Sequence, residues 1–114
     1  MEEPRELLLG AYREFNAREL DAVLARMHPD VIWPNGMDGG FVFGVDQVRD
    51  YWTHQWQILE PNVEPLSISE DLAGRWVVQV HQVVRDRDGQ LLLDTTVRHA
   101  YRIEDGLIVR MDIE

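Results

Sequence analysis

Cysteine is absent from this 114-residue chain, which excludes disulfides, thiol nucleophiles and thiolate metal sites. Basic residues are also scarce, since 11 Lys and Arg stand against 21 Asp and Glu and give a formal net charge of −10. Binding to nucleic acid requires a basic face, and docking on an anionic membrane requires basic clusters. The charge balance therefore argues against both kinds of partner.

Long apolar runs are missing as well. No stretch approaches the roughly 18 apolar residues that a membrane-spanning helix needs. The acidic N-terminal text MEEPRELLLGAYREF does not have the pattern of a signal peptide. We therefore expect a soluble, cytoplasmic protein. Linkers, low-complexity segments and internal repeats are lacking too, so residues 1–114 are expected to form a single domain.

The first half of the chain predicts three helices. Apolar residues recur at helical spacing in segments 4–16, 20–28 and 45–59. Pro4 suits the first turn of the first helix, and Pro29 is expected to end the second.

The second half of the chain predicts strands. Extended segments are expected at 31–33, 41–43, 63–68, 75–85, 91–103 and 107–113. Asp88-Gly89 and Asp105-Gly106 are strong hairpin signals between the last three of them. Helices followed by a strand meander indicate an α+β fold, with the helices on one face of an antiparallel sheet.

The alternation within the long hairpin predicts which side chains share a face. If Asp88-Gly89 is a two-residue turn, Val84 opposes Leu93 and Val78 opposes His99. One face then carries mostly apolar residues and should meet the helices: Trp76, Val78, Val80, Val84, Leu91, Leu93, Val97, His99, Tyr101 and Ile103. His99 is the only titratable imidazole on that face.

The opposite face of the hairpin mixes polar residues with Val77, Val83 and Ala100. A half-apolar outer face suggests a covering partner, most simply a second copy of the chain in a homodimer. The alternative is a set of scattered, exposed apolar residues.

Three stretches carry a resemblance to a known family. They are AYREFNARELDAVLARMHPDVIWPNG, FVFGVDQVRDYW and YRIEDGLIVRMD. Together they resemble the SnoaL-like and ketosteroid-isomerase-like group within the nuclear transport factor 2-like superfold, over nearly the whole chain. The resemblance implies a curved antiparallel sheet packed against three N-terminal helices, forming a cone with an apolar pocket. Its motifs specify the fold far better than the activity.

The resemblance also implies positions for site residues. It places Tyr12 and His99 where ketosteroid isomerases have their two oxyanion donors, and Asn35 where they have the aspartate base. An amide cannot accept a proton from carbon at neutral pH, so the isomerase base is missing. Limonene-epoxide hydrolases, also of this superfold, would need an aspartate where Ile113 stands.

Each candidate catalytic residue has a structural alternative. His99 could exchange a proton with a ligand or be a core histidine bonded to Tyr12, whose own hydroxyl could instead lie at the rim of the core. Asn35 could orient a ligand or simply favour the Pro-Asn-Gly turn. Asp38 could replace the missing base if its loop folds inward, or be a solvated loop residue.

The remaining candidates form apolar walls. The residues expected to contact a ligand are Trp33, Met37, Trp52, Trp56, Val78, Val97 and Met111. The other histidines are placed apart: His28 at the end of the second helix, His54 off the apolar stripe of the third, and His81 on the outer face of the hairpin. No pair of histidines has ligand spacing with a carboxylate, so we predict no metal site and no cofactor.

Three functions remain open from the sequence. The first is a pocket for a small apolar molecule bearing a carbonyl or hydroxyl, with or without cofactor-free isomerisation, cyclisation or dehydration. The second is a binding protein without turnover, which the replacement at Asn35 favours. The third is an assembly module whose pocket is filled by its own side chains.

Overall fold

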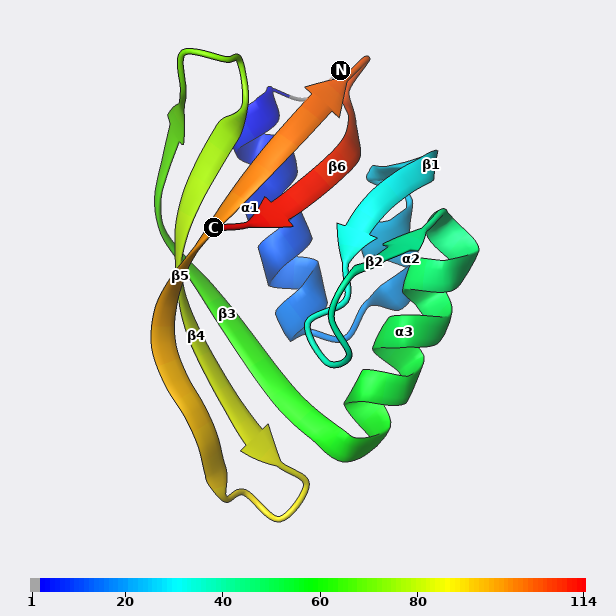
Figure 1. Cartoon of the computed structure of the whole chain (residues 1–114), viewed down its shortest axis with the longest axis vertical. Coiled ribbons are helices and arrows are strands. Elements are labelled where there is room, and N and C mark those ends of the chain that lie inside the picture. Colours follow the sequence, from blue (N-terminus) through cyan, green and yellow to red (C-terminus); the bar gives the residue numbers. More distant parts are fainter. Residues whose placement is uncertain (1–2) are drawn as a thin grey trace.

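The computed structural model describes residues 3–114, which form three helices and six strands (Figure 1). The helices are α1 (Pro4–Asn16), α2 (Leu20–Leu24) and α3 (Val45–Ile58). The strands are β1 (Met27–Pro34), β2 (Phe41–Phe43), β3 (Leu59–Glu70), β4 (Trp76–Asp86), β5 (Leu91–Glu104) and β6 (Leu107–Ile113). No helix in this part of the chain is long and apolar enough to cross a membrane.

The strands form one curved sheet in the order β2-β1-β6-β5-β4-β3. Figure 1 shows α1 inside the curve of the sheet, with α3 on the side opposite β4 and β5. The predicted α+β class and the placement of the helices in the N-terminal half are confirmed. The expectation of a purely antiparallel sheet is wrong in one place, since β1 runs parallel to β6.

The first helix matches its prediction, and the second does not. Helix α1 has Pro4 in its first turn, and it buries Leu8 and Tyr12 against the sheet. Helix α2 ends at Leu24, and the chain is already extended when it reaches Pro29. The histidine expected at a helix end, His28, therefore lies in β1, where its Nδ1 accepts the backbone N–H of Asp30 at 3.0 Å.

Two prolines lie inside β3, which is longer at both ends than the predicted segment 63–68. They are Pro61 and Pro65. A strand at the edge of a sheet tolerates proline because its outer N–H groups have no partner. β3 is an edge strand, and its ladder to β4 runs through Pro61 without a shift, whereas the register shifts at a bulge between Pro65 and Ser67.

The predicted pairing of the long hairpin is confirmed away from its turn. Val84 pairs with Leu93 and Val78 pairs with His99. At the turn the chain differs, because Asp86 N–H donates to the Gln90 carbonyl and encloses a three-residue loop. A bulge in β5 then restores the register between Val84 and Leu93.

The bulge moves Leu91 to the outer face. Leu91 pairs with Arg85, the neighbour of the buried Val84, and so points away from the helices. Its predicted place on the inner face is wrong. Leu92 takes an inward position instead, next to Leu93.

The outer face of the sheet is less apolar than its sequence suggests. Val77 is 6% and Ala100 is 1% exposed within the single chain. His81 lies on this face as predicted, and its Nε2 is 2.7 Å from the Asp94 carboxylate. Since one chain already buries two of the three apolar residues that suggested a partner, the homodimer stays a prediction with a weaker basis.

Candidate active site

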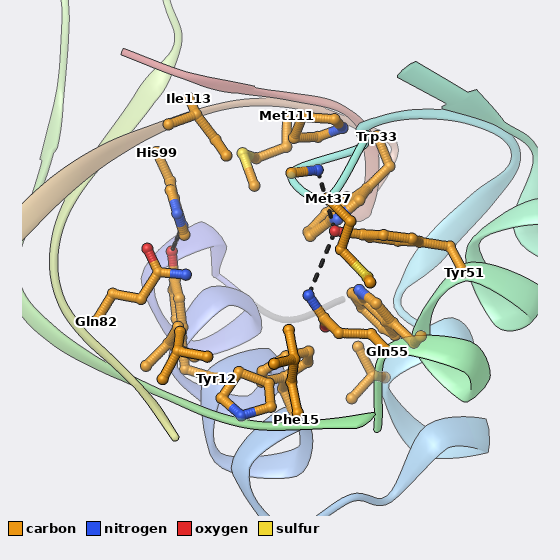
Figure 2. Close-up of a pocket in the computed structure, with 18 of the residues that line it drawn as sticks. Tyr12, Phe15, Trp33, Met37, Tyr51, Gln55, Gln82, His99, Met111 and Ile113 are labelled. Atoms are coloured by element: carbon orange, nitrogen blue, oxygen red, sulfur yellow. Dashed lines mark hydrogen bonds between the residues drawn. The ribbon is translucent and has the colours of Figure 1, made fainter. Parts of the chain in front are cut away.

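A cavity of about 320 Å³ lies between α1, α3 and the inner face of the sheet. Figure 2 shows the side chains that surround it. Its walls are formed largely by aromatic and aliphatic residues: Ala11, Phe15, Val23, Met27, Trp33, Pro34, Met37, Trp52, Leu59, Pro61, Val63, Val84, Leu92, Leu93, Met111 and Ile113. Its polar side chains come from Tyr12, Tyr51, Gln55, Gln82, His99 and Tyr101. Residues 3–114 contribute no Asp, Glu, Lys or Arg to the lining, and therefore no side chain that is charged in its ordinary ionisation state.

Three polar side chains at one end of the cavity form a hydrogen-bonded chain. Tyr101 donates its hydroxyl to Tyr12 at 2.8 Å, and Tyr12 lies 2.8 Å from Nδ1 of His99. We call these three residues the relay. The alternation of β5 places His99 and Tyr101 on the same face, and α1 brings Tyr12 over both of them.

Burial keeps the relay uncharged at neutral pH. Desolvation lowers the pKa of His99 to about 4, since the interior disfavours an imidazolium. It also raises the pKa values of Tyr12 and Tyr101 well above that of a free phenol. All three groups therefore act as neutral hydrogen-bonding partners rather than as charges.

The direction of the hydrogen bonds in the relay sets the tautomer of His99. With Tyr101 donating to Tyr12, the Tyr12 proton has His99 Nδ1 as its acceptor among residues 3–114, and the imidazole proton then resides on Nε2.

The Nε2 atom of His99 has no hydrogen-bond partner in the described part of the chain. Of the fully enclosed side-chain nitrogens and oxygens there, Trp56 Nε1 alone is unpartnered. Since His99 lines the cavity, its N–H is available to a ligand oxygen inside.

A second polar group lies across the cavity from the relay (Figure 2). The Tyr51 hydroxyl accepts the backbone N–H of Gly36 at 3.0 Å and Nε2 of Gln55 at 3.3 Å. Tyr51 and Gln55 are separated by one helical turn on α3 and so share a face. This contact also fixes the loop that carries Met37 against α3.

The cavity includes only part of the predicted apolar wall. Trp33, Met37, Trp52 and Met111 line it. The other three predicted wall residues, Trp56, Val78 and Val97, do not. Val78 is fully buried in the core, Val97 packs against that core, and Trp56 lies against Phe15 and beneath the Arg18 guanidinium.

The loop candidates Asn35 and Asp38 do not line the cavity either. Asn35 Oδ1 accepts the backbone N–H groups of Met37 at 3.1 Å and Asp38 at 2.9 Å, which is the geometry of a side-chain-stabilised turn. Asp38 is exposed. Of the four predicted catalytic residues, the structure brings together Tyr12 and His99 and leaves the other two outside.

The model of the SnoaL-like domain matches residues 9–111. The chain belongs to the SnoaL-like family. No curated protein matches the sequence of this SnoaL-like domain.

Solved structures share the fold of this SnoaL-like domain. An NTF2-like protein of unknown function from Burkholderia pseudomallei is 28% identical, with a TM-score of 0.85 over 100% of this chain and 91% of that one. TerC, co-crystallised with polyporic acid, is 28% identical, with a TM-score of 0.82 over 96% and 88% of the two chains. A protein provisionally assigned as a polyketide cyclase, from Pseudomonas putida, has the same TM-score and coverage at 18% identity, a likeness that concerns the fold alone.

Four polar lining residues of this SnoaL-like domain were not among the predicted site residues: Tyr51, Gln55, Gln82 and Tyr101. Tyr101 had been placed on the inner face of the hairpin by its alternation, without a role in the site. Gln82 follows the alternation that places Val80 and Val84 inside, so the parity of β4 could have identified it. Tyr51 and Gln55 have the spacing of one helical turn but lie beside the apolar stripe of α3. Their inward position depends on the loop that packs on them, which no local pattern predicts.

Proposed function

We propose that this SnoaL-like domain binds a flat, largely apolar small molecule and recognises one of its oxygens through His99 Nε2–H. The observation that carries the proposal is the relay, which holds a neutral imidazole donor in a cavity without charged lining residues. The tyrosines orient the ring and fix its tautomer, so the donor is already in place before a ligand arrives.

The walls support a ring-containing ligand. Trp33 and Trp52 meet edge to face with ring centroids 5.3 Å apart, and Phe15 contacts Trp52 in the same way at 5.1 Å. Aromatic walls with a few fixed polar groups are typical of pockets for small organic molecules. TerC, a structural relative, was crystallised with polyporic acid, which also supports a small organic ligand here.

Calorimetric titration with naphthalene and 2-naphthol tests the proposal. These probes share their rings and differ by one hydroxyl, so their affinity ratio reports recognition of the oxygen. One net hydrogen bond corresponds to a roughly threefold to tenfold preference for 2-naphthol. His99→Phe should abolish that preference, while His54→Phe, at an exposed position of α3, should retain it.

Two results would overturn the proposal. One is the absence of binding by both probes. The other is an unchanged preference for 2-naphthol in His99→Phe, because the oxygen would then be recognised elsewhere.

Cofactor-free turnover is a second candidate, and the relay favours it. A preorganised donor stabilises negative charge that develops on a carbonyl oxygen, as cyclisation and dehydration through an enolate require. The part of the chain that the structure describes places no carboxylate in the cavity wall to abstract a proton from carbon, so the ligand itself or a water molecule would act as the base.

A β,γ-unsaturated ketone separates binding from catalysis. We expect the wild-type protein to bind the ketone without isomerising it, since the required base is missing. Isomerisation that disappears in His99→Phe would establish catalysis at this cavity and exclude a purely binding role.

A further inference from the structure

The second polar group of the cavity has unused hydrogen-bonding capacity. The Tyr51 oxygen accepts N–H groups from Gly36 and from Gln55, and the neighbouring Met37 N–H also stabilises negative charge on it, so its lone pairs are already engaged. With the Gln55 amide oriented so that Nε2 donates to Tyr51, the Tyr51 proton has no acceptor among residues 3–114 and Gln55 Oε1 has no donor there. The pair therefore presents one O–H donor and one carbonyl acceptor.

The residues that carry this donor and acceptor border the same cavity as the relay. Tyr51 and Gln55 both line the cavity, and Figure 2 shows them on the side opposite His99 and Tyr12. Burial raises the pKa of Tyr51, so its hydroxyl stays protonated as a neutral donor. The cavity is thus polar at two opposite ends.

The space between the two ends is apolar. The apolar side chains of Trp33, Trp52, Met37 and Met111 line it. A ligand that satisfies both ends must therefore carry its polar atoms at opposite ends of a flat apolar body.

We propose that Tyr51 and Gln55 bind a second oxygen of the ligand, at the opposite end from the oxygen bound by His99. The ligand class is a flat ring compound with hydroxyl or carbonyl oxygens at both ends. A hydroxyl fits best, because it accepts from Tyr51 and donates to Gln55 Oε1 at once. This inference rests on the proposed function, since it takes the first oxygen to lie at His99.

The test compares 2-naphthol with 2,6-dihydroxynaphthalene, whose hydroxyls are at opposite ends, and with 2,3-dihydroxynaphthalene, whose hydroxyls are adjacent. The 2,6-isomer should bind roughly threefold to tenfold more tightly than 2-naphthol. The 2,3-isomer should show no such gain, because its second oxygen cannot reach the far end.

Two variants locate the gain. Gln55→Leu removes the acceptor without touching the Tyr51 contact to Gly36, and it should reduce the affinity ratio of the 2,6-isomer to 2-naphthol measured in the same variant. Gln57→Leu, at an exposed position on the same helix, is the matched control and should behave as wild type.

Tyr51→Phe distinguishes ligand binding from a purely structural role. Because the Tyr51 hydroxyl also fixes the loop at Gly36, a structural role alone predicts equal weakening of all three naphthols. The proposal predicts a selective loss for the 2,6-isomer.

The outcomes separate the two proposals. If 2-naphthol binds through His99 but the 2,6-isomer gains nothing, or keeps its gain in both Tyr51→Phe and Gln55→Leu, the second oxygen site is wrong and the proposed function stands. If the 2-naphthol preference does not depend on His99, the proposed function is wrong, and the second-oxygen inference is overturned with it.

Discussion

Polar contacts of similar length lie on both faces of β5 and β6, but those on the inner face are buried and neutral, whereas those on the outer face are partly exposed and charged. On the inner face, the relay joins Tyr12, His99 and Tyr101 at 2.8 Å among buried neighbours. On the outer face, Arg110 holds Asp112 by two bonds, of 2.8 and 3.0 Å, near solvent. The inner groups are neutral because burial disfavours charge, whereas the outer groups remain charged because water screens them.

Hydrogen bonds of similar length on the two faces therefore contribute unequally to the free energy of unfolding. A buried group that loses its partner keeps the full cost of its desolvation, whereas an exposed group recovers its hydration. Breaking an inner contact should therefore cost several times more than breaking an outer one.

Tyr12→Phe should have the largest effect. The change removes the middle hydroxyl of the relay, leaving both His99 Nδ1 and the Tyr101 hydroxyl without partners inside the protein. Two unsatisfied buried groups predict a loss of roughly 4 kcal/mol in the free energy of unfolding. Denaturant unfolding measures this loss. Tyr101→Phe should lower the free energy of unfolding clearly less, because it leaves no buried donor without an acceptor. Equal losses in the two variants would contradict the order of donors.

Acidification should weaken the fold through the same relay. The folded-state pKa of His99 is about 4, below its ordinary value of 6.5, so between these values the unfolded chain binds a proton that the folded chain does not. Stability therefore falls as the pH drops from 6.5 to 4, by about 3 kcal/mol in total.

The pH effect is measured as the difference between wild type and His99→Gln in unfolding free energy across that range. The wild-type curve should fall more steeply with acid than the curve of the variant, which cannot titrate at this position. Parallel curves would show that His99 is not buried in its neutral form.

The outer ion pair should contribute much less. Arg110 and Asp112 are partly exposed, and their contact lowers the pKa of Asp112, chiefly through the hydrogen bonds from Arg110. A double-mutant cycle with Arg110→Ala and Asp112→Ala should give a coupling below about 1 kcal/mol, and 1 M salt should reduce it further. A coupling as large as the loss in Tyr12→Phe would refute the contrast between the faces.

The distinction between the faces could largely be predicted from sequence. Alternation in β4 and β5 gives the pairing of Val78 with His99, because an inward register is the only one that buries the valines. The contact of Tyr12 with His99 was foreseen as one alternative, since an amphipathic α1 must cover that face.

Other features depend on long-range packing and could not be predicted. Two such features depend on the strand order of the sheet, which no local sequence pattern encodes. They are the parallel pairing of β1 with β6 and the extension of β3 through its prolines. The same holds for Tyr51 and Gln55, which face the cavity beside a loop brought in by Gly36. The missing carboxylate at Asn35 was visible from the sequence, but its role in the turn required the backbone geometry.

The smallest expected effect concerns the two leucines beside the hairpin turn, where the bulge decides which side chain faces the cavity. Leu91 was predicted inside, whereas the bulge places it outside at 47% exposure and turns Leu92 toward the cavity. Leu91→Thr should change the unfolding free energy by no more than about 0.5 kcal/mol and leave 2-naphthol binding unaltered. Leu92→Thr has a similar exposure of 51% and is the matched comparison, and it should weaken 2-naphthol binding measurably because it removes apolar wall. If Leu91→Thr weakened binding and Leu92→Thr did not, β5 would lack the bulge and the simple two-residue turn would hold.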